Sequence, residues 1–594
     1  MAGNQAWVQA PLAALGRGLR VDSFSSRPAP WRTRGMVWFF GVLLGALLAR
    51  SAQIQIVNAD FYLKQGEARY LRALEQEAVR GRILDRNGEI LAMSAPAVSL
   101  WASPELSEQD PSRLRQLARV LGLSELELAA RLAPKANFVW LRRHADDALV
   151  EAAMALKLPG LLRTEEYKRV YPSGAVAGPV LGLTNLDQRG QEGIELVFEQ
   201  SLRGQAGRRL VSADRLGRAV EEAAAGASVQ YGQDLFLSLD SVVQYHAFSA
   251  LRDLVEQSGA KSASLVALDA RSAEVLAMAS YPSQDPQQRR EFSPDHMRNK
   301  SVTDLFQPGG LVQPLLAALM LDAGRVGAES ILRAEFRSFG FEGLTFTRPP
   351  SLDSPTLAQA LASACDICVA QLALELQPRE LFDFYTRLGF GRKPVIEFPG
   401  AVAGWVAPVK NWGPQGQAKL ALGYGLNTSL LQLARAYLVL TADGQAVEAT
   451  LRKNPQAVQP LPVVSASVAA RVREMMGDAP RRGEASTPNY PLIGRGAIES
   501  KLGQAGYSKS KYRALFLGMA PADQPRLIIA LLLDEAQLPQ SQSLWSLARL
   551  SEGLADRTLW RLGVVPSGPR SPGPAGPGPG ESRPRQSRVG AGRP

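Results

Sequence analysis

One uninterrupted apolar run lies near the start of the chain. Residues 35–49 read GMVWFFGVLLGALLA and carry no charge, and after Arg50 a weaker apolar face continues to Val57. The stretch 35–57 is 23 residues long, enough for a helix that spans a bilayer with some tilt. The pattern therefore predicts a transmembrane anchor over 35–57, in which Arg50 can reach the interface or pair inside a complex.

The residues before this run set its expected orientation. Five arginines precede it: Arg17, Arg20, Arg27, Arg32 and Arg34. Positive flanks stay on the cytoplasmic side, so residues 1–34 are predicted to be a cytoplasmic tail and everything after residue 57 to lie outside the membrane. The alternative is a cleaved signal peptide, with Ala49-Arg50-Ser51 as the cleavage site. Because 34 residues are long for a secretory n-region, we favour the uncleaved anchor.

Local patterns predict an α+β organisation after the anchor. The pair Asn87-Gly88 between apolar segments predicts a hairpin turn, and leucines and alanines at helical spacing predict helix over 106–156. Glycines punctuate 171–220 and indicate short strands and turns. A new pattern then begins, with a strand over 234–239, an amphipathic helix over 241–257, and strands over 264–268 and 274–279 joined by a turn.

These patterns divide the chain into domains. With 594 residues it is too long for one core. We place one extramembrane domain at 58–228, with the boundary near 225–232, and a larger one at 229–566. Residues 567–594 contain PGPAGPGPG and many arginines, a composition that cannot build a core and predicts disorder.

The net charge of +11 does not indicate a nucleic-acid partner, because most of the basic excess lies near the two ends of the chain. Residues 1–34 and 570–594 each carry +4, which leaves +3 for residues 35–569. A nucleic-acid-binding domain would show its basic excess on the folded part, so we expect no nucleic-acid partner. The three histidines are scattered and there are two cysteines; we expect no metal site and no cofactor.

Several segments, taken in order, resemble the class B penicillin-binding proteins, and among them the division-specific septal peptidoglycan transpeptidase. In the first extramembrane domain the resemblance rests on Arg80, Gly81, Asp85, Arg86, Gly88, Gly193 and Glu195, within RGRILDRNGEILAMS (80–94) and YPSGAVAGPVLGLTNLDQRGQEGIE (171–195). In the second it rests on ASYPSQDP (279–286), MRNKSVTDLFQPG (297–309), GYGLNTSLLQLARAY (423–437) and LGMAPADQPRLIIALLL (517–533).

The resemblance implies both location and fold. It places the chain in a bacterial inner membrane as a single-pass protein with its bulk in the periplasm. It implies a pedestal of the dimerisation type over 58–228. Over 229–566 it implies a β-lactamase-like transpeptidase domain: a five-stranded antiparallel sheet with helices on both faces and an all-helical lobe.

That family uses three motifs around one cleft, and the resemblance places degenerate versions of all three here. Ser-x-x-Lys supplies a nucleophile and a base on one helix face, but its positions are Gly310 and Gln313. Ser-x-Asn falls on Ala364 and Asp366. Lys-Thr-Gly falls on Lys501, Leu502 and Gly503, where the threonine has become leucine. Because Gly310 has no side chain and an amide is no base at neutral pH, we expect an inactive transpeptidase.

Substitute nucleophiles are weak candidates in the sequence. Ser301 and Thr303 precede the expected helix, and no lysine follows Ser363 three residues later. Cys365 would need a histidine or a lowered pKa. Cys365 and Cys368 share a helix face and an oxidising compartment, so they either bridge or remain two free thiols in a degraded pocket.

Three functions follow as hypotheses. In the family, the anchor and pedestal contact a multi-spanning membrane glycan polymerase, so the first is a non-catalytic scaffold or regulator of such a polymerase and other division proteins. The second is an active D,D-transpeptidase that uses unrecognised residues. The third is a module that binds the peptidoglycan stem peptide, with Lys501 in an open cleft.

Overall fold

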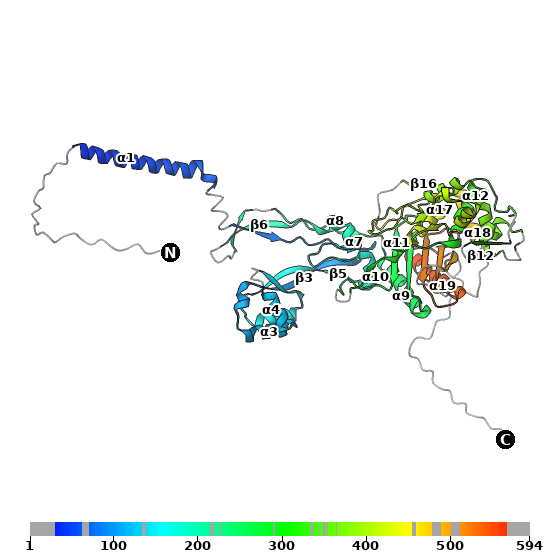
Figure 1. Cartoon of the computed structure of the whole chain (residues 1–594), viewed down its shortest axis with the longest axis horizontal. Coiled ribbons are helices and arrows are strands. Elements are labelled where there is room, and N and C mark those ends of the chain that lie inside the picture. The colour runs from blue at the N-terminus through cyan, green and yellow to red at the C-terminus, as the bar shows by residue number, and fades with distance from the viewer. Residues whose placement is uncertain are drawn as a thin grey trace, which may run out of the picture. The chain divides into compact units, whose positions relative to one another are not determined.

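A computed structural model describes residues 30–61, 71–133, 138–213, 219–224, 227–288, 292–332, 337–341, 344–347, 352, 354–363, 365–453, 459–477, 489–500 and 511–566. Its internal contacts divide the chain into two compact units. The first is residues 1–76 with 207–228, and the second is residues 77–206 with 229–594. Figure 1 shows the elements of both.

The first unit holds the apolar helix. Helix α1 (Pro30–Ala52) continues into a π-helical turn, η1 (Gln53–Val57), and the stretch Arg34–Val57 is long and apolar enough to cross a membrane. Its large apolar side chains, such as Trp38 at 75% exposure, face outward, which is favourable in lipid and costly in water. The same unit has an antiparallel sheet of order β1-β6-β7, formed by Leu71–Gln76, Gly207–Ala213 and Ala219–Ala224.

The first part of the second unit, residues 77–206 with 229–237, is here called the pedestal. Its sheet has the strand order β4-β3-β2-β8, and β5 pairs with β3. The predicted hairpin is confirmed, because β2 and β3 are antiparallel and are joined through Gly88 at φ 92°. The strands are β2 (Ile83–Leu84), β3 (Ile90–Ala102), β4 (Val139–Ala145), β5 (Leu161–Val170) and β8 (Leu235–Phe236).

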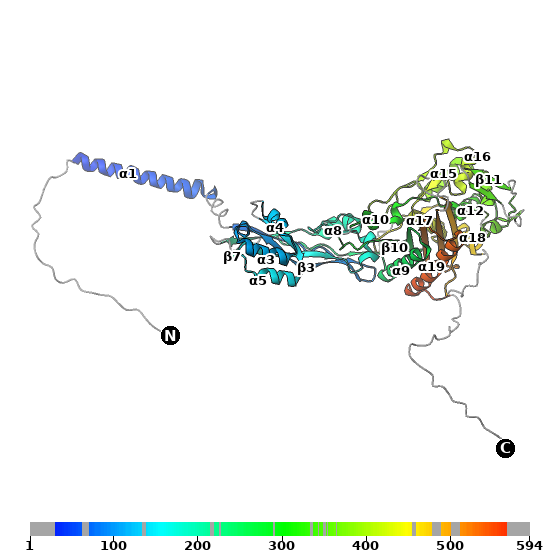
Figure 2. The same ribbon diagram turned by 60° about the horizontal axis from the view of Figure 1, so that its bottom comes forward.

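Helices cover one side of the β3–β4–β5 sheet (Figure 2). Leu100 of β3, Leu141 of β4 and Leu161 of β5 are buried with Leu117 and Leu128 in one apolar core. The helices are η2 (Pro104–Glu108), α3 (Pro111–Leu121), α4 (Glu125–Leu132) and α5 (Asp147–Ala155). Further along, short helical turns carry the glycine-rich segment: η3 (Gly174–Val176), α6 (Gly178–Leu181), α7 (Gly193–Val197) and α8 (Glu199–Arg203).

Two expectations about this region are wrong in part. Helix was predicted throughout 106–156, but Val139–Ala145 is strand β4. Its Trp140 is the Cα partner of Trp101 on β3, so cross-strand pairing outweighs the helical spacing of the flanking leucines. The strand expected over 234–239 is only the two residues Leu235–Phe236, which pair in parallel with β2.

The larger part of the second unit, residues 238–566, is built on the antiparallel sheet β10-β9-β19-β18-β17. This confirms the five-stranded antiparallel sheet and the predicted strand pair at 264–279. Its strands are β9 (Ser262–Asp269), β10 (Val275–Tyr281), β17 (Ile493–Ser500), β18 (Tyr512–Ala520) and β19 (Leu527–Asp534).

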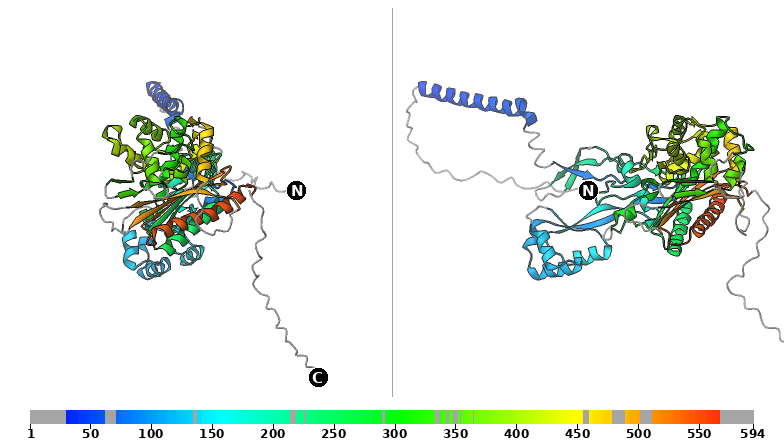
Figure 3. Two further views of the ribbon diagram at one scale, coloured as in Figure 1. Left: turned by 90° about the vertical axis from the view of Figure 1, so that its right-hand side faces the viewer. Right: turned by 45° about the vertical axis from the view of Figure 1, so that its right-hand side comes forward.

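Both faces of this sheet are buried. In β9, Leu265 and Ala267 pack with the core under α9 (Ser241–Ser258) and α19 (Gln540–Arg561), whereas Val266 and Leu268 pack into the opposite core. Figure 3 (left) shows the orange strands with the red α19 on one side and green helices on the other. Because apolar residues are needed on both faces, the central strands β9 and β19 read as nearly continuous apolar runs.

The opposite core is mostly helical. Its central helix, α17 (Leu430–Thr441), contacts β9 and β19. The other elements of this part are α10 (Pro294–Met297), α11 (Lys300–Thr303), η5 (Gly309–Val312), α12 (Gln313–Asp322), α13 (Leu357–Ala362), α14 (Asp366–Ala373), α15 (Pro378–Arg387), η6 (Val409–Asn411), α16 (Pro414–Ala421) and α18 (Ala466–Gly477), with strand pairs β11 (Ser338–Phe341)/β12 (Leu344–Thr347), β13 (Trp405–Val406)/β14 (Leu426–Asn427) and β15 (Gln445–Ala446)/β16 (Leu461–Pro462).

Candidate functional site: the degenerate cleft and the pedestal cluster

The segment predicted to carry the first motif turns from η5 into α12. Gly309 adopts φ +55°, and Gly310 is buried at the position of the nucleophile. The hydroxyl of Tyr437 on α17 donates to the carbonyl oxygen of Leu311 at 2.5 Å. Burial raises the pKa of Tyr437, so its hydroxyl stays protonated and holds this turn in place.

The base position is occupied by a fully buried amide. Gln313 is 0% exposed, and its Oε1 accepts a hydrogen bond from Nη2 of Arg495 on β17. Nη1 of the same guanidinium donates to the carbonyl oxygen of Leu361, at 3.0 Å. An uncharged acceptor therefore faces a buried cation where the family has a lysine.

The second motif lies at the start of α14. Cys365 and Cys368 form a disulfide with a Cα–Cα distance of 5.3 Å, so the bridge spans the first turn of the helix. Asp366 is the first residue of α14, and Ala364 lies outside the described residues. The hydroxyl of Ser363, exposed at the end of α13, donates to the carbonyl oxygen of Gln359 at 2.6 Å. This hydroxyl therefore makes a contact within the end of its own helix.

The third motif, Lys501, Leu502 and Gly503, lies outside the described residues. The structure instead brings Glu499 of β17 to the first motif. Its Oε1 accepts from the backbone N–H of Gln307 at 3.0 Å, and its Oε2 accepts from Nη1 of Arg513 at 3.2 Å.

Sequence reasoning missed Arg495 and Glu499 as cleft residues. The available signal was a pair of charges four positions apart on a strand, since residues separated by an even number of positions share one face. In chemical terms, the two positions that should attack a carbonyl and accept a proton hold glycine and an amide.

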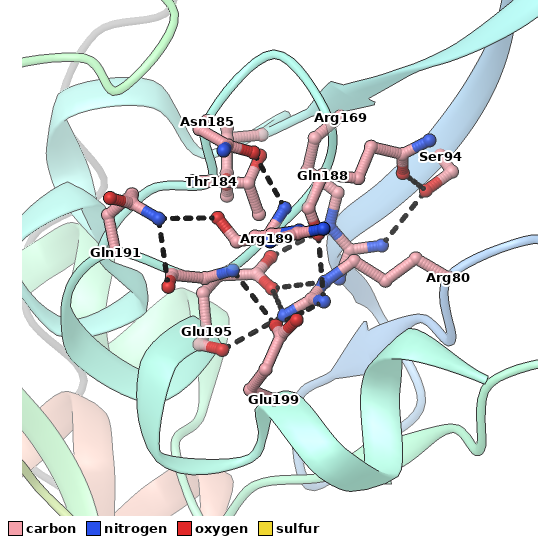
Figure 4. Close-up of polar contacts among 12 residues, drawn as sticks. Arg80, Ser94, Arg169, Thr184, Asn185, Gln188, Arg189, Gln191, Glu195 and Glu199 are labelled. Atoms are coloured by element: carbon pink, nitrogen blue, oxygen red, sulfur yellow. Dashed lines mark hydrogen bonds and ion pairs between the residues drawn. The ribbon is translucent and has the colours of Figure 1, made fainter. Parts of the chain in front are cut away.

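In the pedestal, Arg80 lies at the centre of a buried charge cluster (Figure 4). Its Nε donates to Glu195 Oε2 at 2.7 Å and its Nη1 to Glu199 Oε2 at 2.6 Å. Arg169 Nε donates to the other oxygen of Glu195, also at 2.7 Å. Two guanidinium groups and two carboxylates thus neutralise one another, the condition under which charges are tolerated in a protein interior.

Backbone groups complete the cluster. Arg80 donates to the carbonyl oxygens of Gln188 and Glu195, at 3.0 and 2.9 Å, and the N–H of Gly190 donates to Glu199 at 2.8 Å. The side chain of Gln188 accepts from Ser94 at 2.6 Å. The cluster therefore ties strand β3, the 188–190 loop and helices α7 and α8 into one body.

A second set of predicted pedestal residues contacts the sheet-bearing part. Asp85 Oδ2 accepts from the N–H and the hydroxyl of Ser241, at 3.0 and 2.8 Å. Burial alone would raise the pKa of Asp85, but the hydrogen bonds from Ser241, Glu89 and Asn87 outweigh it and hold that pKa below its usual range. Arg86 Nη2 pairs with Glu274 at 3.2 Å. We call these contacts the Asp85 joint.

Family models match both parts of the chain. The model "Penicillin-binding Protein dimerisation domain" matches residues 75–237, and "Penicillin binding protein transpeptidase domain" matches 263–549. The chain is 34% identical over 520 residues to the probable peptidoglycan D,D-transpeptidase PenA of Neisseria gonorrhoeae, covering 85% of this chain and 89% of that protein. It is 33% identical to the peptidoglycan D,D-transpeptidase FtsI of Escherichia coli K12, with coverages of 84% and 88%.

This chain is a class B penicillin-binding protein of the cell-division type. A solved structure agrees on the fold: penicillin-binding protein 3 of Mycobacterium tuberculosis superposes with a TM-score of 0.64 at 23% identity, over 84% of this chain and 98% of that one. The transpeptidase domain of Burkholderia pseudomallei penicillin-binding protein 3 has a TM-score of 0.50 at 31% identity, over 56% and 98%.

The pedestal of this penicillin-binding protein also has an open cavity of about 580 Å³ beside the cluster. Arg80 and Gln188 of the cluster line this cavity. Trp140 and the exposed Arg189 and Arg203 also line it. Trp140 is covered by the guanidinium of Arg143, 4.8 Å from the ring centroid. Within the described residues, no group of three or more histidine, cysteine or acidic side chains is arranged to hold a metal ion.

Proposed function

We propose that this protein acts in septal peptidoglycan synthesis without catalysing cross-linking, as a scaffold or regulator of a membrane glycan polymerase. The observation that carries the proposal is the pair Gly310 and Gln313 at the nucleophile and base positions. Loss of a covalent nucleophile alone costs on the order of 10⁶ in kcat. Backbone donors near Gly310 would have no acyl intermediate to stabilise.

The contrast between cleft and pedestal supports this function. The relatives are named peptidoglycan D,D-transpeptidases, a chemistry that needs the lost groups. By contrast, the pedestal motif residues Arg80, Asp85 and Glu195 are all engaged in buried or joint-forming contacts. We further propose that α1 anchors the chain in the bacterial inner membrane, with residues 1–34 in the cytoplasm and the pedestal in the periplasm, because the arginines precede the helix.

The alternative is an active D,D-transpeptidase, and a fluorescent penicillin separates the two. The full-length native protein should give no labelled band at its mass of 64.0 kDa, in a gel where an intact penicillin-binding protein labels strongly. A covalent band from the native chain would show that it still has a nucleophile and would overturn the proposal. A Gly310→Ser/Gln313→Lys double variant tests whether the cleft can be restored.

The scaffold role has its own test in co-purification with the host's multi-spanning glycan polymerase in detergent. We expect association that is lost when α1 is replaced by an unrelated membrane helix. We also expect it to be weakened by Arg189→Glu at the pedestal cavity. Arg163→Glu, an exposed arginine of β5 that does not line the cavity, is the matched control. No association of the native chain would contradict the scaffold role.

A further inference from the structure

We infer that the pedestal cavity is a binding site for a short zwitterionic peptide, with Arg189 and Arg203 holding its carboxylates and Glu77 holding its ammonium group. The described residues that line the cavity all lie between Glu77 and Ala206, within one compact unit. The volume of about 580 Å³ is in the range of pockets that bind small ligands. The inference goes beyond the scaffold role and does not depend on it.

Two arginines at the cavity already have their charges compensated within the protein. Arg80 is neutralised inside the buried cluster. Arg143 pairs with Glu166 at 2.8 Å and with Asp187 at 2.7 Å. These groups satisfy one another, so a ligand would gain little from them.

The other two arginines of the wall are unpaired. Arg189 and Arg203 are exposed and line the cavity, and their guanidinium groups make no hydrogen bond or ion pair with any residue that the structure describes. A guanidinium binds a carboxylate through two parallel hydrogen bonds. The cavity therefore offers two unsatisfied groups of the kind that recognise carboxylates.

The buried charge cluster positions both of these arginines. It binds the carbonyl oxygen of Gln188 at 3.0 Å and the N–H of Gly190 at 2.8 Å, the two chain neighbours of Arg189. It also binds helix α8 through Glu199, and Arg203 lies one turn further along the same face of that helix. Because the backbone is already fixed at both positions, binding costs less in ordering of the protein.

Glu77 belongs to an acidic group at the same cavity. Its carboxylate has no hydrogen-bond or ion-pair partner among the described residues. Its pKa is raised, first by burial and then by the carboxylates of Glu166 and Asp187, against which Arg143 acts. Three carboxylates thus share one guanidinium, and an ammonium group is attracted to such an excess of negative charge.

The cavity as a whole matches a ligand that carries charges of both signs. The two unpaired arginines offset the excess of two carboxylates around Arg143, so neither a pure anion nor a pure cation is favoured. Trp140 and Tyr167 also line the wall and add ring surface against which a peptide backbone can pack. Two sources share this chemistry: an exposed segment of a partner protein, and a stem peptide with an ammonium-bearing side chain.

Isothermal titration of the full-length protein in detergent tests the site. The probes are synthetic peptides, capped at both ends, in which Lys is separated from Asp-Glu by glycine spacers of increasing length. We expect saturable binding of at least one of them, and none of matched peptides with Asn-Gln in place of Asp-Glu. If no charged peptide binds, or if the Asn-Gln peptides bind equally well, the inference is wrong.

Variants of the wall show whether the bound peptide lies in this cavity. Arg189→Gln and Arg203→Gln should each weaken binding at least about threefold. Glu77→Gln should weaken the Lys peptides and not those with norleucine in place of Lys. Arg163→Gln, on β5 and away from the cavity, is the matched control. Undiminished binding by the Arg189→Gln/Arg203→Gln double variant would overturn the site.

A synthetic stem pentapeptide with a free side-chain ammonium, titrated in the same way, distinguishes the two sources. Binding that depends on Arg189 and Arg203 would assign the site to the stem peptide. Binding of the Lys and Asp-Glu peptides alone would assign it to a protein segment. If neither kind binds, the inference fails while the scaffold role stands, because co-purification with the polymerase is measured separately.

Discussion

The guanidinium of Arg80 and the carboxylate of Glu195 meet at 2.7 Å across 115 residues of sequence. Their side chains are 1% and 0% exposed, so the pair is among the most deeply buried charges in the described chain. Arg169 binds the second oxygen of the same carboxylate. Glu195 is therefore the residue on which two buried cations depend.

Replacement of Glu195 by glutamine should destabilise the pedestal strongly. It leaves Arg80 and Arg169 close together with their shared counter-charge removed, and breaking a buried pair in this way costs about 3–5 kcal/mol. Chemical denaturation of the full-length protein, followed by tryptophan fluorescence, measures the loss. Glu199→Gln, whose side chain is 24% exposed, is the milder control. An unchanged unfolding midpoint for Glu195→Gln would contradict the structural role assigned here.

The Asp85 joint should make stability depend on acid pH. Because the pKa of Asp85 is lowered in the folded state, its stabilisation is complete above the unfolded value of about 3.9. It is lost as the pH falls through the still lower folded pKa. Asp85→Asn should therefore cost about 1.5–3 kcal/mol at neutral pH and much less at the acid end.

The measurement for Asp85 is a Tm series from neutral pH down to pH 3, on the native protein and on Asp85→Asn. The two curves should converge as the pH falls. Ser241→Ala, which removes one donor to Asp85 while leaving the carboxylate, should shift Tm in the same direction by less. Parallel curves over the whole range would show that the carboxylate charge is not what matters at this joint.

Local patterns predicted the elements whose contacts are local. The Asn87-Gly88 hairpin and the β9–β10 pair follow from turn residues and alternation within a few positions. Strand β4 was not predicted. Val139–Ala145 becomes a strand through pairing with β3, some 40 residues earlier in the chain, and the helical spacing of the flanking leucines gave no sign of that pairing. The apolar helix α1, long enough to cross a membrane, could be predicted from length and composition alone.

In the cleft and in the pedestal cluster, too, the contacts between residues distant in sequence could not be predicted. Gly310 and Gln313 were placed by the resemblance to the family's first motif, and the structure puts them at the turn from η5 to α12. Arg495 could not be connected to Gln313, because 182 residues separate them and no local pattern records which face of β17 meets α12. Arg80 and Glu195 were chosen by resemblance, and their direct contact emerged only in the folded chain.

Gly193 of the pedestal should not tolerate a side chain. It adopts φ +60°, and a Cβ there would lie 2.6 Å from both the amide nitrogen of Gly182 and the carbonyl oxygen of Val180. Gly193→Ala should cost more than about 2 kcal/mol, since backbone strain of about 1–2 kcal/mol adds to the clash. Gly122→Ala is the matched control, because Gly122 has a similar φ of +66° but open space around it. Unfolding by urea compares the two; equal losses would mean that crowding at Gly193 contributes nothing.

The disulfide between Cys365 and Cys368 should stabilise the cleft region modestly. It closes a loop with a sequence separation of only three, and the chain-entropy relation gives about 2 kcal/mol for a loop this short. Cys365→Ala/Cys368→Ala should lower the unfolding midpoint accordingly. Reductant equilibrated in denaturant should lower the midpoint of the native protein and leave that of the double variant unchanged. Since both sulfurs are buried, a midpoint insensitive to reductant in both proteins would mean that the bridge does not constrain the unfolded chain.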